Sequence, residues 1–245
     1  MSHGHGAQVE QLLKAINKWC DRSLQKVIVT VNAPDLDTAY FSQSMEDLPF
    51  QLCIIKNSLP LGFGANQNQA FKECCSDYFF VLNPDLDLPT NPFPELLKAL
   101  SSDLTGCAYP TQTSPSGDLQ DFERDLPTPS AILKRLLSSI DKKSKSPARA
   151  QWVSGAFMAF DSAVFRRLAG FDEGYFMYCE DVDICLRLQL AGFKLSRADT
   201  TVVHHAQRQS LKSLPHLIWH IRSLLRLWRS NSYKSYRQQF PVDSA

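Results

Sequence analysis

The chain has 245 residues, of which 44% are hydrophobic, so it is long enough to bury the core of one large domain or two small ones. The net charge of +1 hides an asymmetry: residues 206–245 hold seven basic residues and one acid, whereas residues 1–205 hold 19 basic and 24 acidic residues. Because only the tail carries a net positive charge, the composition disfavours a nucleic-acid-binding protein. No apolar run is long enough to span a bilayer, no signal sequence is visible and the seven cysteines lack CxxC spacing, which predicts a cytoplasmic protein with reduced thiols.

Strand and helix patterns alternate along the first hundred residues. The predicted elements are a helix over 9–19, strands over 27–31 and 52–55, a glycine-bearing turn at 61–66 leading into a helix that reaches about residue 75, a strand over 78–82 and a helix over 94–100. This alternation predicts an α/β fold with a Rossmann-like, mostly parallel sheet flanked by helices. Residues 109–149 lack this alternation of strand and helix patterns, and they predict a long loop with one helix over 131–140.

An acidic cluster opens a predicted helix in the last third of the chain. Glu180, Asp181 and Asp183 precede apolar residues at near-helical spacing, and Gly192 suits the end of that helix. Carboxylates in a first helical turn lie at the positive end of the helix dipole, which keeps them ionised and exposed. Such a cluster is either an ordinary helix cap or a base held at the edge of a cleft.

Two further acids follow a predicted buried strand. Pro84 ends the strand over 78–82, so Asp85 lies just beyond its carboxyl end, where open α/β sheets bind ligands. Asp85 and Asp87 form an i, i+2 pair of oxygen ligands that would suit Mg²⁺ or Mn²⁺ shared with a substrate phosphate. The alternative is a turn filled with its usual residues.

The segment from Gly62 to Asn68 places glycines before a predicted helix. Backbone amides in such a turn can approach a phosphate, although glycines also simply make turns. The segment is neither a GxGxxG nor a Walker loop, which disfavours dinucleotide-binding and P-loop functions.

Five segments in chain order resemble the family 2 inverting glycosyltransferases of GT-A fold, in their rhamnosyltransferase-like branch. They are LGFGANQNQAF, FFVLNPDLDL, WVSGAFMAF, GFDEGYFMYCEDVDICLRLQLAGF and VVHH, and the resemblance runs from about residue 27 to about residue 233. It implies transfer of a sugar from a nucleotide-diphosphate sugar, dTDP-rhamnose by analogy to the branch, to a hydroxyl of a glycan or lipid-linked saccharide. It further implies inversion at the anomeric carbon, a divalent cation (Mg²⁺ or Mn²⁺) and a role in bacterial cell-surface polysaccharide synthesis.

The resemblance also assigns roles to individual residues. Asp181, in the Glu180–Asp181 pair, matches the general base, which takes the proton of a poorly nucleophilic sugar hydroxyl. Asp85 matches the metal and diphosphate contact that stabilises the leaving group, with Asn83 in place of the first acid of that motif. The implied donor-binding residues are Asn32, Gly62, Phe63, Asn68, Asn83, Asp85, Gly155 and Ala156. The candidate metal ligands are Asp85, Asp87 as its i, i+2 partner, and His204 or His205, one of which matches the histidine that closes the family's site from the last strand.

Two departures from the family pattern leave an alternative open. Residues 1–6 resemble the tail of the family's first strand without the strand itself, which indicates either a start recorded too late or the loss of that strand. In addition, Val31 precedes Asn32 where the family has an acid that reads the base. Both departures favour a catalytically impaired relative, a pseudoenzyme or a glycan- or nucleotide-binding module. A nucleotidyltransferase would need a glycine-rich basic loop near the N-terminus, and none is visible.

The predicted organisation is a GT-A domain over 1–205 and a basic helical tail over 206–245. Within the domain, donor binding is expected in about 1–110 and acceptor binding and catalysis in about 150–205. In the tail, apolar residues alternate with Arg222, Arg226 and Arg229. We expect this helix to pack on the domain. The second interpretation is a peripheral contact with the inner face of the plasma membrane, beside a lipid-linked acceptor.

Overall fold

The computed structural model describes residues 1–20, 23–32, 48–137, 150–205 and 214–241. In chain order its elements are α1 (Gly6–Trp19), β1 (Lys26–Val31), β2 (Gln51–Lys56), α3 (Phe63–Phe71), β3 (Tyr78–Leu82), β4 (Leu86–Asp87), α4 (Phe93–Leu100), β5 (Thr105–Thr113), β6 (Glu123–Arg124), α5 (Pro129–Leu137), β7 (Trp152–Val153), β8 (Phe157–Asp161), α6 (Ser162–Arg167), α7 (Glu180–Leu190), β9 (Lys194–His204), α8 (Leu214–Arg229) and α9 (Asn231–Gln239).

The central sheet has five strands in the order β3-β8-β5-β9-β4. Strand β8 is antiparallel to both of its neighbours, β9 is parallel to β5, and β4 is antiparallel to β9. Strands β1 and β2 form a separate parallel pair. The predicted α/β class with helices around a central sheet is confirmed, and the pairing within the five-stranded sheet is mixed.

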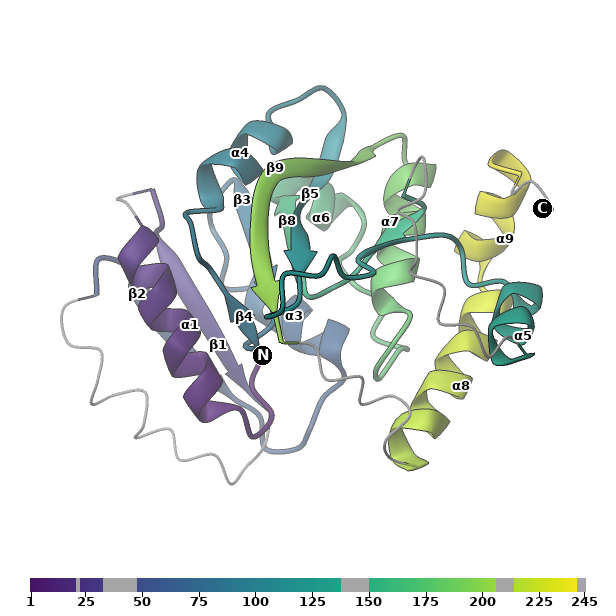
Figure 1. Ribbon diagram of the computed structural model, residues 1–245, viewed down its shortest axis with the longest axis horizontal. Helices are drawn as coiled ribbons and strands as arrows, with labels where there is room; N and C mark the ends of the chain where they lie inside the picture. Colours follow the sequence, from purple (N-terminus) through teal and green to yellow (C-terminus); the bar gives the residue numbers. More distant parts are fainter. Residues whose placement is uncertain (21–22, 33–47, 138–149, 206–213, 242–245) are drawn as a thin grey trace.

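Helices cover both faces of this sheet, because its central strands alternate their side chains between two apolar clusters. Phe157 and Ala159 of β8 pack in the cluster that contains α1 and α4. Met158 and Phe160 pack in the cluster that contains α3, α6 and α7. This period of two is what a strand buried on both faces requires. Figure 1 shows α1 beside the β1–β2 pair and α7, α8 and α9 at the opposite side of the molecule.

The first residues of the chain lie against the free edge of β1. Ser2 forms a single parallel bridge with Val31, its N–H donating to the Thr30 carbonyl at 2.7 Å and its carbonyl accepting from the Asn32 N–H at 2.8 Å. Residues 1–6 therefore lie where the tail of an additional strand would lie. Among the described residues, Ser2 alone pairs with this edge of β1.

Two predicted boundaries are wrong. Residues 109–113, assigned to a loop, belong to β5, because Pro110 and several polar residues mask a strand whose side chains are mostly buried. Its Gly106 allows close packing: a Cβ there would lie 3.0 Å from both Val164 Cγ1 and Phe193 Cβ. The helix after the glycine-bearing turn ends at Phe71, short of residue 75. Residues 138–140 of the predicted helix lie outside the described residues.

The tail forms two helices that meet at Ser230, whose hydroxyl caps α9 by accepting from the Tyr233 N–H at 3.2 Å. Leu224 and Leu227 of α8 and Tyr233 and Tyr236 of α9 are buried. Both helices thus pack on the rest of the fold. No helix in the described part of the chain is long and apolar enough to cross a membrane.

Candidate active site

The turn at residues 154–156, between β7 and β8, joins the end of β3 to the start of α7. The Asn83 N–H donates to the Ala156 carbonyl at 2.8 Å, and the Gly155 N–H donates to Asp181 Oδ2 at 3.2 Å. A Cβ on Gly155 would lie 3.3 Å from Asp181 Cβ and 3.6 Å from the Phe63 ring. Five residues predicted from separate motifs therefore meet at one place.

A sharp backbone turn delivers the acidic pair to the first turn of α7. Tyr178 and Cys179 have φ values of 71° and 65°. Non-glycine residues pay roughly 1–2 kcal/mol each for this left-handed conformation, and such strain is often retained at functional sites. Asp181 Oδ1 then accepts from the Val182 N–H at 2.9 Å. With both of its oxygens on backbone N–H groups, the Asp181 carboxylate is held in one orientation.

Glu180 and Asp181 differ in how well their charged forms are stabilised. Burial, together with the nearby charge of Asp181, raises the pKa of Glu180 well above its ordinary value, and its Oε2 accepts no hydrogen bond from the described residues. Burial also raises the pKa of Asp181, although the hydrogen bond from the Gly155 N–H and the positive charge of Arg124 lower it in part. Of the two carboxyl groups, Glu180 therefore holds its proton more tightly. The expectation that the carboxylates of the cluster would be exposed is wrong for Glu180 and for Asp183, because tertiary packing buries both side chains.

Replacing Glu180 by Gln should flatten the pH dependence of stability. A carboxyl whose native pKa is raised binds its proton more tightly in the native state, so stability falls as pH rises from the unfolded pKa, about 4.3, towards the native one. We expect wild type to lose stability relative to Glu180→Gln as the pH is raised through that window. Thermal unfolding midpoints between pH 4 and pH 8 measure this, with the surface change Glu95→Gln as the control. Parallel pH profiles for wild type and Glu180→Gln would contradict it.

Asp85 lies beside His204, where β4 pairs with the end of β9. His204 Nε2 is 3.5 Å from Asp85 Oδ2, and His204 Nδ1 lies 3.0 Å from Gln120 Oε1, which fixes the ring orientation. Burial alone would raise the pKa of Asp85, but the hydrogen bond and charge of His204, with the charge of His5, lower it below its ordinary value. Asp85 is thus an ionised carboxylate in a half-buried position.

Asp87 and His205 form a second pair on the outer side of the same edge. His205 Nε2 lies 2.6 Å from Asp87 Oδ2, and both side chains are well exposed. The four predicted metal ligands therefore form two separate pairs. Among the described residues, no three His, Cys, Asp or Glu side chains come close enough together to hold a metal ion.

One observation at Asp85 nevertheless fits a divalent cation. Asp85 Oδ1 is buried and has no hydrogen-bond partner in the described structure. An orphaned buried carboxylate oxygen is costly unless a ligand satisfies it. Mg²⁺ and Mn²⁺ commonly bind one or two protein groups and complete their coordination with substrate phosphates and water.

The amino-terminal turn of α3 is fastened to the segment that leads into α7. The Phe63 N–H donates to the Phe176 carbonyl at 2.9 Å, and a Cβ on Gly62 would lie 2.7 Å from that same oxygen. Asn68 Oδ1 accepts from the Phe171 N–H at 2.8 Å, and its Nδ2 donates to the Phe171 carbonyl at 2.9 Å. Gly62, Phe63 and Asn68 therefore position residues 170–176, and the Asn68 amide is engaged within the protein.

Asn32, predicted to contact the donor, belongs to a buried asparagine network. Its Oδ1 accepts from Asn57 Nδ2 at 3.0 Å, from Asn66 Nδ2 at 3.1 Å and from the Leu61 N–H at 2.8 Å, while its Nδ2 donates to the Leu61 carbonyl at 2.8 Å. The network ties the end of β1 to the loop before α3. Asn32 in this structure shapes the loop with its side chain.

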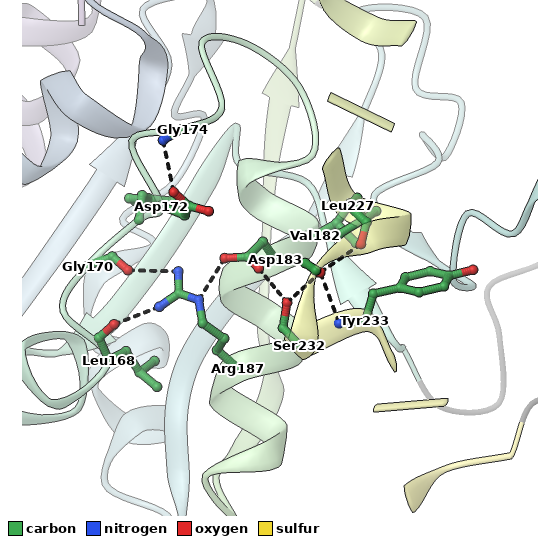
Figure 2. A network of polar contacts seen from close by, with 12 residues as sticks. Leu168, Gly170, Asp172, Gly174, Val182, Asp183, Arg187, Leu227, Ser232 and Tyr233 are labelled. Carbon is green, nitrogen blue, oxygen red and sulfur yellow. Dashed lines mark hydrogen bonds and ion pairs between the residues drawn. The ribbon is translucent and has the colours of Figure 1, made fainter. Parts of the chain in front are cut away.

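A polar network holds α9 against α7, the helix that begins with the acidic pair (Figure 2). Arg187 Nε donates to Asp183 Oδ2 at 2.7 Å, and its other nitrogens donate to the carbonyls of Leu168 and Gly170. Ser232 of α9 donates to Asp183 Oδ1 at 2.7 Å. Asp183, predicted only as part of the acidic cluster, thus has a positioning role.

Three groups of residues at this site were not predicted from the sequence. They are Gln120, which orients His204, His5, whose charge reaches Asp85, and the pair Asn57 and Asn66. The asparagine pair carried a weak signal, because Asn57 follows a predicted strand just as Asn32 does. His5 carried a weak signal as one of two glycine-spaced histidines near the N-terminus, and Gln120 carried none.

The profile of Glycosyl transferase family 2 matches residues 4–169, more than half of the chain. The chain belongs to glycosyltransferase family 2. A second profile, the N-terminal domain of galactosyltransferase, matches residues 135–214. The predicted enzyme class, an inverting glycosyltransferase, is confirmed.

Curated relatives of this family 2 glycosyltransferase include rhamnosyltransferases. It is 30% identical over 247 residues to the rhamnosyltransferase WbbL of Escherichia coli K12, covering 92% of this chain and 89% of that protein. It is 26% identical over 166 residues to N-acetylglucosaminyl-diphospho-decaprenol L-rhamnosyltransferase of Mycobacterium tuberculosis, covering 60% of this chain and 53% of that protein.

Solved structures of glycosyltransferases share the fold. GalNAc-T7 with UDP, GalNAc and Mn²⁺ matches with a TM-score of 0.65 at 16% identity, covering 94% of this chain and 47% of that one. The mannosyltransferase PcManGT of Pyrobaculum calidifontis, in complex with GDP-Man and Mn²⁺, matches with a TM-score of 0.64 at 14% identity, covering 98% and 68%. The GT-A fold class is confirmed.

Proposed function

We propose that this glycosyltransferase moves a rhamnosyl group from dTDP-rhamnose to a hydroxyl of a lipid-linked saccharide, with inversion. The reaction would build bacterial cell-surface polysaccharide at the cytoplasmic face of the plasma membrane. The similarity to two rhamnosyltransferases, one of which is named for a decaprenol-linked acceptor, supports the sugar and the acceptor class. The main support for the mechanism is the hydrogen bond from the Gly155 N–H to Asp181 Oδ2. It lies beside the hydrogen bond from the Asn83 N–H to the Ala156 carbonyl.

Asp181 acts as the general base in this proposal. Two backbone N–H groups fix its carboxylate, and its raised pKa lies closer to the working pH than that of an ordinary Asp. A base with such a pKa accepts the proton of the acceptor hydroxyl as the hydroxyl attacks the anomeric carbon. Glu180 is kept protonated by burial, so it adds no second negative charge near the attacking oxygen of the acceptor hydroxyl.

Asp85 and His204 hold the diphosphate end of the donor in this proposal. Asp85 would hold a divalent cation, and the cation would supply positive charge that stabilises the leaving group. Gln120 fixes the His204 ring, so that Nε2 stays directed at Asp85. Gly155 and Ala156 form the wall beneath the sugar, where only a small side chain leaves room against Asp181.

A transfer assay with defined substrates tests the function. The full chain would be incubated with Mn²⁺, a synthetic N-acetylglucosaminyl-diphospho-lipid and, in turn, dTDP-rhamnose, UDP-GlcNAc and GDP-mannose. We expect rhamnosyl product only, with the anomeric configuration opposite to that of the donor by NMR. Transfer from another donor would overturn the assignment of the sugar. Donor binding without transfer to any saccharide would favour a binding module.

A further inference from the structure

The outer face of α8 carries a stripe of exposed apolar side chains. Leu214, Ile218, Ile221 and Leu225 follow one another at intervals of three or four residues and are between 39% and 70% exposed. Such intervals place side chains on one face of a helix. We call these four residues the α8 stripe. Helices of folded proteins normally turn an apolar face inward, so a stripe facing outward marks an interaction surface.

Arginines border the α8 stripe along one side. Arg222 lies four residues after Ile218, Arg229 lies four residues after Leu225, and both are exposed. Neither forms an ion pair with any residue that the structure describes. Residues 214–239 include five basic residues and no acid. The stripe is therefore apolar at its centre and positively charged around it.

The opposite face of α8 packs on the segment that leads into α7. Ser223 Oγ donates to the Met177 carbonyl at 2.8 Å, and the Trp219 and Phe176 rings lie 4.9 Å apart between centroids. Arg226 forms an ion pair with Asp172 at 2.9 Å. These contacts fix α8 next to the backbone turn that delivers Asp181, with the stripe directed away from it.

We propose that the α8 stripe docks on an anionic membrane surface. Its apolar side chains would enter the boundary between headgroups and acyl chains, and Arg222 and Arg229 would contact lipid phosphates. Charge decides between the two plausible occupants. Anionic headgroups neutralise this surface, whereas a second copy of the chain would add positive charge to it. The proposal does not depend on the identity of the donor sugar.

Liposome co-sedimentation tests this surface. Wild type should bind vesicles of phosphatidylglycerol and phosphatidylcholine, and bind phosphatidylcholine vesicles far less. Ile218→Ser/Ile221→Ser should weaken binding at least tenfold, because each Ile loses its apolar burial. Arg222→Gln/Arg229→Gln should weaken binding to the anionic vesicles about tenfold or more.

Matched controls change the same residue types elsewhere on the surface. Leu59→Ser/Leu119→Ser alters two side chains that are 73% and 56% exposed, and Lys72→Gln/Lys194→Gln removes two exposed charges. Both should bind vesicles as wild type does. Transfer to a water-soluble acceptor should be unchanged in all four variants, which separates membrane docking from the proposed reaction.

Three results would overturn the proposal. They are a wild type that does not bind anionic vesicles, control variants that lose as much binding as the stripe variants, and a wild-type dimer that Ile218→Ser/Ile221→Ser converts to a monomer. The last result would show that a second copy covers the stripe.

Discussion

Asp181→Asn should reduce kcat by roughly 10²–10⁴-fold while leaving the KM for the donor nearly unchanged. The amide cannot accept the proton of the acceptor hydroxyl, and removal of a general base typically costs that much. The Asn Oδ1 can still accept the hydrogen bond that the Gly155 N–H now gives to Asp181, at 3.2 Å in the wild type. Steady-state kinetics with varied donor and varied acceptor measure the two parameters separately.

Two further variants show whether the loss belongs to Asp181. Glu180→Gln mimics the protonated carboxyl that burial maintains, so kcat should fall by less than about tenfold, well below the effect of a missing base. Asp77→Asn changes an exposed carboxylate outside the site and should behave as wild type. If Glu180→Gln lost activity as completely as Asp181→Asn, Glu180 would be the base and the proton assignment would be reversed.

Asp85→Asn should remove the metal-dependent part of nucleotide-diphosphate binding, a loss of about 10–100-fold in affinity. Asn keeps the size of the side chain but lacks the charge that a divalent cation needs. Because Asp85 Oδ1 has no hydrogen-bond partner among the described residues, the substitution breaks little within the fold. Titration calorimetry with dTDP and UDP, with and without Mn²⁺, measures the difference and also identifies the preferred base.

Asp87, the exposed neighbour of Asp85, provides the control variant. Asp87 pairs with His205 at the surface, so Asp87→Asn should weaken metal-dependent binding much less. Equal losses in the two variants would mean that both carboxylates bind the cation. Unchanged binding in Asp85→Asn would exclude Asp85 from the site.

The sequence was most informative where the local pattern and the fold impose the same requirement. The apolar run at 78–82 with Pro84 after it predicted β3 and the position of Asp85, and the acidic cluster with Gly192 predicted α7 to within two residues. Both predictions rest on strand and helix periodicity and on turn chemistry, which are properties of neighbouring residues. The family resemblance added the order of the segments and hence the fold class.

The remaining features arise from contacts between distant residues. Glu180 is buried although its helix position favours exposure, and Asn32 is engaged by Asn57 and Asn66, which lie 25 and 34 residues further along the chain. Strand β5 was missed because proline and polar residues are tolerated in a strand that its neighbours enclose. Such features follow from tertiary packing and are not encoded in any local window.

The contact between α7 and the C-terminal helices has a consequence for how this enzyme type can diversify. Ser232 of α9 donates a hydrogen bond to Asp183, and Arg226 of α8 forms an ion pair with Asp172. These are two polar contacts that many helical hairpins could reproduce. Leu224, Leu227, Tyr233 and Tyr236 are also buried in this contact, so a hairpin exchanged between homologous enzymes would have to match their apolar surface as well as the hydroxyl and the cation. The C-terminal hairpin and the residues that it covers are therefore expected to vary together among homologous enzymes.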